Sequence, residues 1–282
     1  MASTLFSKEP FPSGARVACR IEYDGNAYNG WQSQPVGHNS TTVQDVLETA
    51  LAQIAQQPIR VHCAGRTDSG VHGHCQIIHF DQPVERSARA WTIGVNTSLP
   101  TDVRVHWAKV VQASFHARFS ATARRYRYLI ANTAVRPALL HRYAAWHRRP
   151  LDAAVMHHAA QCLVGSQDFS AFRAASCQSS SPVRDVHHVA VTRHADLVVI
   201  DIQANAFLHH MVRNLAGSLM AIGDGRREAA WLVQLLAARD RTLAADTAPA
   251  CGLYLVDVLY PSAYELPPTP AGPALLHGLS SL

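Results

Sequence analysis

The chain of 282 residues presents the same order of apolar patterns twice, and this order limits its fold more than any other feature. In the first half, a strand pattern, a helix pattern, two strand patterns, a short helix and a further strand follow one another. The second half repeats the order with one additional helix. Sheets with helices packed on one face bury the apolar sides of such elements. We therefore predict an α+β fold of two similar βαββαβ halves, each a mainly antiparallel sheet with helices on one face.

The spacing of apolar residues sets approximate bounds for these elements. Strands are expected around 17–23, 59–63, 75–80, 103–107, 123–130, 183–192, 197–204 and 253–260. Helices are expected around 43–54, 87–95, 152–163, 207–222 and 228–238. Thr41 and Gln44 have the spacing of a capping box at the start of the first helix. In the helix 207–222, Met211 and Leu215 fall on the predicted buried face, with Arg213 and Asn214 on another side.

The same patterns suggest how the chain divides into domains. We expect a flexible N-terminus over 1–14, an N-terminal α+β domain over 15–112, a C-terminal α+β domain over 113–263 and a Pro-rich tail over 264–282. Duplication is inferred from the order of elements alone, because the two halves share no residue-level repeat.

Composition places the chain among globular proteins, since hydrophobic residues make up 48% and charged residues 16%. No apolar run approaches the roughly 20 residues that cross a bilayer, and Pro10 and Pro12 interrupt the start where a signal peptide needs an apolar core. The six cysteines are dispersed, as is typical of reduced thiols. We expect a cytoplasmic protein without membrane association, disulfides or a cysteine zinc site.

Positive charge is concentrated in one segment. Between Val103 and Leu151 there are ten basic residues and no Asp or Glu, whereas the rest of the chain has a net negative charge. Aromatic residues such as Tyr126 and Tyr128 lie among the arginines. Guanidinium groups bind phosphates and aromatic faces stack on unpaired bases, so this mixture favours an RNA with exposed bases. The alternative is a solvated face whose arginine content reflects genomic base composition.

One loop between two apolar strands carries a candidate catalytic group. Asp68 lies in the run Ala64–His72, flanked by Gly65 and Gly70, where glycines let a backbone approach a substrate closely. On spacing alone, a turn aspartate that binds its own backbone is the simpler interpretation. A zinc site of His72, His74 and Cys75 is a weak pattern, so we predict no metal.

Several sequence blocks resemble the tRNA pseudouridine synthase A (TruA) family. They occur in order from about residue 16 to Tyr260, and this order makes the resemblance specific. The blocks are Tyr23-Asp24-Gly25 with Gly30-Trp31-Gln32, Ala64 to His72, Phe115 to Ala121, Arg125 to Tyr128, Phe207 to Asn214, and Gly252 to Leu255. Ser69 departs from the family, which commonly has Ala there, and the turn is expected to tolerate this change.

The resemblance implies an isomerase, a cofactor-free homodimer that converts uridine to pseudouridine at positions 38, 39 and 40 of the tRNA anticodon stem-loop. It further implies that Asp68 is the nucleophile, Arg213 its partner, Tyr126 the ring that stacks on the uracil and Leu253 a wall of the pocket. The implied tRNA contacts are Arg66, which helps to extrude the base, and Arg86, Phe115, His116, Ala117, Arg118, Phe119, Ser176, Cys177, Gln178, Ser179 and Ser180.

Two other functions remain open at this point. A non-catalytic RNA-binding or RNA-chaperone protein is possible because βαββαβ is also the order of RNA-recognition modules. Such a protein binds tRNA without modifying it. A zinc hydrolase that uses His72, His74 and Cys75 ranks last, and stoichiometric zinc would support it.

Overall fold

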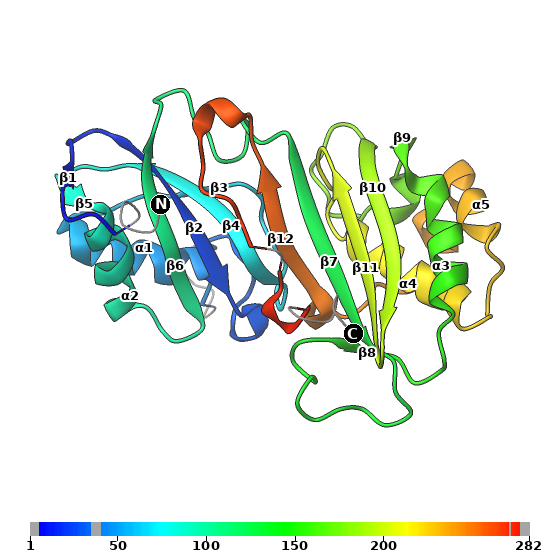
Figure 1. The fold of residues 1–282 in the computed structure, drawn as a ribbon. Helices are drawn as coiled ribbons and strands as arrows, with labels where there is room; N and C mark the ends of the chain where they lie inside the picture. The colour runs from blue at the N-terminus through cyan, green and yellow to red at the C-terminus, as the bar shows by residue number, and fades with distance from the viewer. Residues whose placement is uncertain (1–5, 35–40, 271, 277–282) are drawn as a thin grey trace. The chain divides into compact units, whose positions relative to one another are not determined.

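The computed structural model describes residues 6–34, 41–270 and 272–276 (Figure 1). Contacts between residues divide the chain into two units. The first unit holds the residues up to Thr122 and the stretch that begins at Leu255, and the second runs from Ala123 to Tyr254. Sequence analysis put the division at 112–113 and ended the second domain at 263, and those domain bounds stay a prediction.

The first unit contains the predicted strands and helices in the predicted order, with two further short strands that the sequence did not indicate. Its strands are β1 (Pro10–Phe11), β2 (Arg16–Tyr23), β3 (His62–Cys63), β4 (His72–Asp81), β5 (Arg86–Ser87) and β6 (Val103–Val111), with most of β12 (Leu253–Leu259). Its helices are α1 (Val43–Ala55) and α2 (Val95–Ser98), the latter preceded by a π-helical turn over Ala90–Gly94. The strands follow the order β6-β2-β4-β12, and β2 is antiparallel to both β4 and β6.

The core of this unit lies between the sheet and its helices. Alternate residues of β2, such as Val17 and Ile21, are fully buried with Leu47 and Leu51 of α1. This arrangement follows from the period of two in the strand and the period near 3.6 in the helix. The core therefore fixes β2 and β4, and the candidate loop directly precedes β4.

The cap of α1 differs by one residue from the predicted capping box. Thr42, not Thr41, is the N-cap, and its hydroxyl accepts a hydrogen bond from the Asp45 backbone N–H at 3.3 Å. The Gln44 side chain is turned inward instead, where its Oε1 accepts from the Ser33 N–H at 3.1 Å. Two adjacent threonines satisfy the same pattern, so spacing alone could not choose between them.

The second unit contains the strands and helices predicted over 123–238 in the predicted order, with two further short strands that the sequence did not indicate. Its strands are β7 (Ala123–Ala131), β8 (Ala145–Trp146), β9 (Gly165–Asp168), β10 (Val183–His194) and β11 (Leu197–Ala204). Its helices are α3 (Ala153–Ala160), α4 (Met211–Gly223) and α5 (Trp231–Ala238). The strands follow the antiparallel order β7-β11-β10-β9, and β8 runs parallel to β7. In Figure 1, α3 and α4 lie on one side of this unit's strands. The predicted α+β class is confirmed.

Helix α4 begins later than the sequence indicated. Residue His210 has the left-handed φ of 62° in the turn that precedes the helix, so the helix starts at Met211 rather than at Phe207. Asn214 is also buried, whereas the sequence predicted that it lies on a side of the helix that faces away from the core. Its Nδ2 donates to the Phe172 carbonyl at 2.8 Å, because α4 is enclosed on several sides and not on one face only.

Both predicted terminal segments make contacts in their described parts. Strand β1 pairs with β5, and the Thr269 hydroxyl lies 3.2 Å from the Cys75 Sγ. Residues 1–5, 271 and 277–282 of these segments lie outside the described residues. Among the helices of the described residues, none has the length and apolar character needed to cross a membrane.

Candidate functional site

The loop that carries Asp68 connects β3 to β4 in the first unit. Asp68 is half-buried, and its backbone carbonyl accepts a hydrogen bond from the Val71 N–H at 3.1 Å. Gly70 has a φ of 79°, a conformation that glycine adopts without strain. The backbone carbonyl of Asp68 thus closes a tight turn, which places the carboxylate on a rigid support.

The buried side chain of Gln76 on β4 holds the start of this loop. Its Oε1 accepts from the N–H groups of Ala64 and Gly65 at 3.1 and 3.3 Å, and its Nε2 donates to the Gly65 carbonyl at 2.6 Å. A buried amide that satisfies three backbone groups makes this end of the loop costly to displace. Sequence analysis missed Gln76, although a polar residue inside an apolar strand pattern was the available signal.

The middle of the loop is held by the last residue of β2 and by the segment that follows this strand. The Tyr23 hydroxyl and the Thr67 hydroxyl lie 2.8 Å apart in a buried pair, and the Trp31 N–H donates to the Thr67 carbonyl at 3.0 Å. Two residues after Thr67, the Ser69 hydroxyl donates to the Tyr28 carbonyl at 3.1 Å. The polar residue that departs from the family pattern therefore adds a tether to the loop.

Two glycines allow this close approach of backbone to backbone. A Cβ on Gly25 would lie 1.9 Å from the Val71 carbonyl oxygen, and one on Gly30 would lie 2.8 Å from that of Thr67. Asp24 caps the turn at Gly25 by accepting from the Asn26 N–H at 3.0 Å. Burial opposes ionisation of Asp24, but hydrogen bonds with His72 and Asn26 hold its pKa below the usual range.

Removing the Tyr23 hydroxyl is expected to loosen the loop. In Tyr23→Phe, the Thr67 hydroxyl loses a buried partner that contributes about 1 kcal/mol, so backbone amides of residues 64–71 should exchange with solvent about fivefold faster. Hydrogen exchange followed by mass spectrometry measures this change. Tyr28→Phe is the matched control, because that hydroxyl donates to Asp102 and not to the loop. Equal exchange in both variants would show that the Tyr23 hydroxyl does not hold the loop.

The second unit positions three of the predicted site residues. Tyr126 on β7 is 8% exposed, and its ring meets that of Phe207 edge-to-face with centroids 5.0 Å apart. Leu253 opens β12 and is buried. Arg213 in the first turn of α4 is half-buried, and its Nε donates to the Ala248 carbonyl at 2.8 Å. The Arg213 side chain is therefore neither fully exposed nor fully buried.

The predicted tRNA-contact run from Phe115 to Phe119 divides by burial. Phe115 is completely buried, with ring centroids 5.1 and 5.0 Å from Tyr260 and Tyr264, and Ala117 is also completely buried. In contrast, Arg118 is exposed and Phe119 is 75% exposed. The buried pair anchors the loop, whereas the exposed pair is available to a ligand.

Histidines beneath this loop make stability depend on pH. The Nδ1 of His79 accepts from the Ala117 N–H at 3.1 Å, and burial, with the charges of His116 and Arg16, lowers the pKa of His79 from 6.5 to about 4. The unfolded chain binds this proton more readily, so stability is complete above pH 6.5 and falls as the pH decreases toward 4. We expect a loss on the order of 2 kcal/mol between pH 7 and pH 5.

Urea denaturation at the two pH values measures this loss. The His79→Asn variant keeps an acceptor for the Ala117 N–H but has no titrating group at this position. Its free energy of unfolding should therefore depend less on pH than that of the unmodified chain. An unchanged dependence would assign the acid sensitivity to other groups.

The remaining predicted contacts lie on two further surfaces. Arg66 is exposed on the Asp68 loop, while Arg86 on β5 donates from Nε to the Ile54 carbonyl at 2.8 Å and so caps α1. In the second unit, Arg173 holds the loop of Ser176, Cys177, Gln178, Ser179 and Ser180. Its Nη2 donates to the carbonyls of Cys177 and Ser179 at 2.6 and 2.7 Å.

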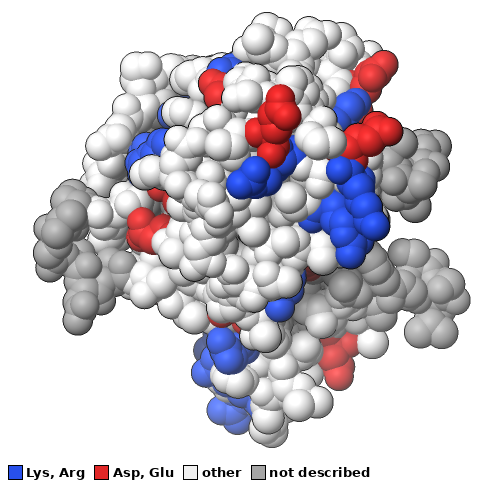
Figure 2. Space-filling model, turned by 90° about the vertical axis from the view of Figure 1, so that its left-hand side faces the viewer, with Lys and Arg blue, Asp and Glu red and all other residues white. Residues whose placement is uncertain are grey.

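Part of the basic segment is neutralised by one acidic residue from a neighbouring strand. Arg125 makes two hydrogen bonds of 2.7 Å with Asp201 on β11, and Arg127 makes one of 2.8 Å. On the face shown in Figure 2, acidic and basic side chains lie interspersed. The arginines of the segment that remain exposed are Arg118, Arg136, Arg142, Arg148 and Arg149.

The three residues of the weak zinc pattern contact different groups. His72 lies 3.2 Å from Asp24, while the Nε2 of His74 lies 3.2 Å from the Pro270 carbonyl. Cys75 lies beside Thr269, and burial raises the pKa of its thiol to about 11. These contacts hold β4 and the C-terminal segment together and do not converge on one point.

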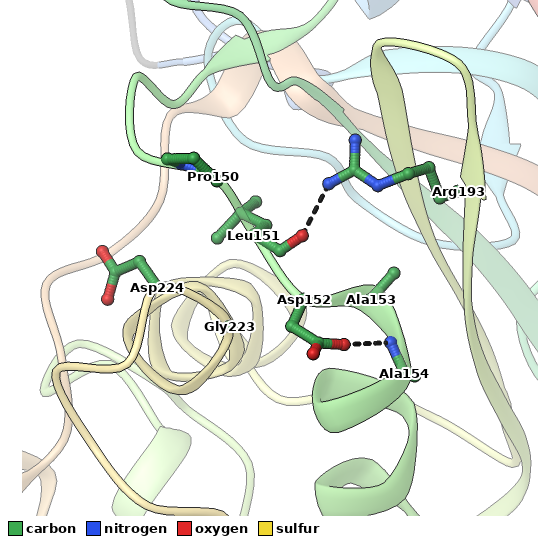
Figure 3. Close-up of a pocket in the computed structure, with 8 residues that line it drawn as sticks. All are labelled: Pro150, Leu151, Asp152, Ala153, Ala154, Arg193, Gly223 and Asp224. Carbon is green, nitrogen blue, oxygen red and sulfur yellow. Dashed lines mark hydrogen bonds between the residues drawn. The ribbon is translucent and has the colours of Figure 1, made fainter.

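An open hollow of about 600 Å³ lies elsewhere in the second unit (Figure 3). Its polar groups already serve the fold, since Arg193 donates to the Leu151 carbonyl and Asp152 caps α3 through the Ala154 N–H. Its lining residues in the described part of the chain are Pro150, Leu151, Asp152, Ala153, Ala154, Arg193, Gly223 and Asp224. The hollow offers few groups for chemistry, and we do not assign the site to it.

Comparisons with known proteins agree with the sequence blocks. A family model described as tRNA pseudouridine synthase matches residues 20–120 and 159–261. The chain is 54% identical over 270 residues to tRNA pseudouridine synthase A of Escherichia coli O1:K1 and to that of Escherichia coli O139:H28, covering 96% of this chain and 99% of each relative. A chain in the crystal structure of a Cbf5–Nop10–Gar1 complex is similar over 85% of this chain and 48% of that one, at 12% identity and a TM-score of 0.35.

Proposed function

The chain belongs to the tRNA pseudouridine synthase A family, and we propose that it converts uridine to pseudouridine at positions 38, 39 and 40 of the tRNA anticodon stem-loop. It is accordingly an isomerase that modifies tRNA. The observation that carries the proposal is the 54% identity over nearly the whole chain. The rigid support of the Asp68 loop agrees with it.

The reaction itself explains which groups are needed. The bond between the sugar C1′ and the uracil N1 breaks, the base turns, and a bond from C1′ to C5 forms while the C5 proton leaves and N1 gains one. Nothing is oxidised and no group leaves the substrate, so this chemistry needs no redox cofactor or group carrier. We propose that Asp68 is the nucleophile and that Arg213 keeps this carboxylate charged while the site excludes water.

Further residues act on the base. A uridine in a stem or loop must be flipped out at a cost of a few kcal/mol, and stacking on an aromatic ring, at about 1–3 kcal/mol per base, offsets much of this cost. We propose Tyr126 as that ring, Leu253 as an apolar wall of the pocket and Arg66 as the residue that helps to extrude the base. The edge-to-face contact with Phe207 supports this role for Tyr126, because it fixes the ring plane.

The half-buried His116 and the exposed residues Arg118 and Phe119, together with Ser176 to Ser180, are proposed to contact the tRNA outside the pocket. Phe115 and Ala117 are buried and Arg86 is bound to α1, so we propose that these three support the contact surface. A homodimer and a cytoplasmic location are proposals that follow from the family and from tRNA as the substrate.

Mapping pseudouridine tests the proposed function. Unmodified tRNA transcribed in vitro is incubated with the purified protein, and modified positions are read by chemical derivatisation and sequencing. We expect product at positions 38 to 40 and at no other uridine. Bound tRNA that remains unmodified would favour the non-catalytic RNA-binding protein instead, and product at other positions would overturn the assigned sites.

A further inference from the structure

We propose that His62, His116 and Phe119 form a stacking platform for one unpaired nucleobase of the substrate RNA. The inference rests on the proposed function, because it concerns how the same tRNA is held. All three residues belong to the first unit, as does the Asp68 loop.

The rings form a continuous column that leads from the core to the surface. His62 on β3 stacks on the buried His79 of β4, with centroids 5.0 Å apart and planes inclined by 21°. His116 lies 4.6 Å from His79 and 5.4 Å from His62. Phe119 ends the column, 4.4 Å from His116 at an interplanar angle of 33°. A single exposed apolar side chain is ordinary on a protein surface. Phe119 differs because its exposed ring is the end of an ordered series of ring contacts.

Backbone hydrogen bonds hold the exposed end of the column in place. The Nδ1 of His116 accepts from the N–H groups of Arg118 and Phe119 at 3.1 and 3.3 Å. The Ser120 hydroxyl accepts from the His116 N–H at 2.9 Å, and the Ser120 N–H donates to the His116 carbonyl at 2.9 Å. The platform is thus formed before any ligand binds, which lowers the entropic cost of stacking.

Positive charge next to the rings identifies the ligand as a nucleic acid. The Arg118 guanidinium lies 5.6 Å from the centre of the Phe119 ring. Burial raises the pKa of the Cys63 thiol to about 11, and the positive charges of Arg66 and Arg118 oppose this rise. Both guanidinium groups therefore lie close enough to influence the residue that follows His62. Rings for bases and guanidinium groups for phosphates are the combination that holds unpaired RNA.

The platform also continues directly into the catalytic loop. His62 and Cys63 form β3, and the loop that carries Arg66 and Asp68 begins at the next residue. His62 pairs with His79, whereas the loop ends at His72, seven residues away along β4. A strand advances about 3.3 Å per residue, so a base on the rings lies roughly 20 Å from the end of the loop and is separated from the reacting nucleotide by several nucleotides.

Equilibrium binding of anticodon stem-loop RNA tests the platform. Binding is measured by fluorescence anisotropy in an Asp68→Asn background, so that the RNA stays unreacted. We expect His62→Ala and Phe119→Ala each to weaken binding about tenfold, without changing its dependence on salt. Phe119→Trp and His62→Phe keep a ring and should bind within about twofold of the background protein. Leu243→Ala, which removes another exposed apolar side chain (53% exposed), should bind like the background protein.

An RNA with one abasic nucleotide identifies the stacked base. At one loop position, the abasic RNA should bind the background protein about tenfold more weakly, and Phe119→Ala should cause no further loss. Undiminished affinity of both alanine variants would overturn the platform, as would a loss in Phe119→Trp equal to that in Phe119→Ala or losses that add at every abasic position. Because only affinity is measured, failure here leaves the pseudouridine mapping, and so the proposed function, unaffected.

Discussion

Asp68→Asn is expected to bind tRNA normally and to form pseudouridine more slowly by a factor on the order of a thousand or more. The amide has nearly the shape of the carboxylate but cannot attack as an oxyanion. The substitution leaves the loop's backbone tethers in place, since residue 68 contributes its carbonyl to the bond from the Val71 N–H. Single-turnover assays with saturating protein measure the chemical step separately from affinity.

Ser69→Ala is the matched control in the same loop. It removes the hydrogen bond to the Tyr28 carbonyl but leaves Asp68 and the Gln76 contacts intact, so we expect the rate to stay within about threefold. The asparagine of the Asp68→Asn variant can deamidate to aspartate, and Asp68→Ala measured in parallel separates true activity from this regeneration. Wild-type product formation by freshly prepared Asp68→Ala would rule out the assigned nucleophile.

Patterns of apolar residues predicted a helix or strand correctly where one buried face determines the spacing of its apolar residues. The apolar face of α1 was predicted correctly, and so were the alternate core residues of β2, although Ala18 and Arg20 on the other face of β2 are buried as well. Helix α4 is enclosed on several sides, so its burial no longer follows one face, and Asn214 was misplaced. The left-handed residue His210 that starts this helix has no sequence signature that distinguishes it from a helical histidine.

The distribution of charge along the sequence predicted the site less well than the apolar patterns predicted the strands and helices. The acid-free segment indicated binding to RNA phosphates, but strand pairing brings Asp201 opposite Arg127, where its carboxylate binds both Arg125 and Arg127. Linear charge density cannot reveal such a partner, because sheet register depends on the whole fold. The same limit applies to Phe115, which the resemblance grouped with Phe119 although its side chain faces the core.

Positioning residues were recognised least well, because their role depends on distances between segments far apart in the chain. Tyr23 and Gly25 lie in a block that the resemblance includes without giving either residue a role. Only the structure shows that the first bonds Thr67 and that the second lets the turn after β2 approach Val71. The loop's geometry is therefore encoded largely outside the loop.

Gly25→Ala is expected to show this dependence most directly. The added methyl group would lie 1.9 Å from the Val71 carbonyl oxygen and 2.6 Å from its carbon, and because both are backbone atoms, one segment must move. Overpacking of this kind costs about 1–3 kcal/mol of unfolding free energy. A shift at Val71 also moves Asp68 through their hydrogen bond, so pseudouridine formation should fall about a hundredfold, as misplacement of reacting groups by an ångström does.

Gly94→Ala separates this steric effect from the general effect of replacing glycine. The atom nearest to a Cβ at that position is the Ile54 Cδ1 at 3.4 Å, an ordinary contact, and alanine favours the helical segment around it. Chemical denaturation should therefore show unchanged or greater stability for Gly94→Ala, with the wild-type rate of product formation. If Gly25→Ala behaves in the same way, the turn after β2 does not position the catalytic loop; if it loses rate and stability together, the nucleophile depends on a glycine more than forty residues away in the sequence.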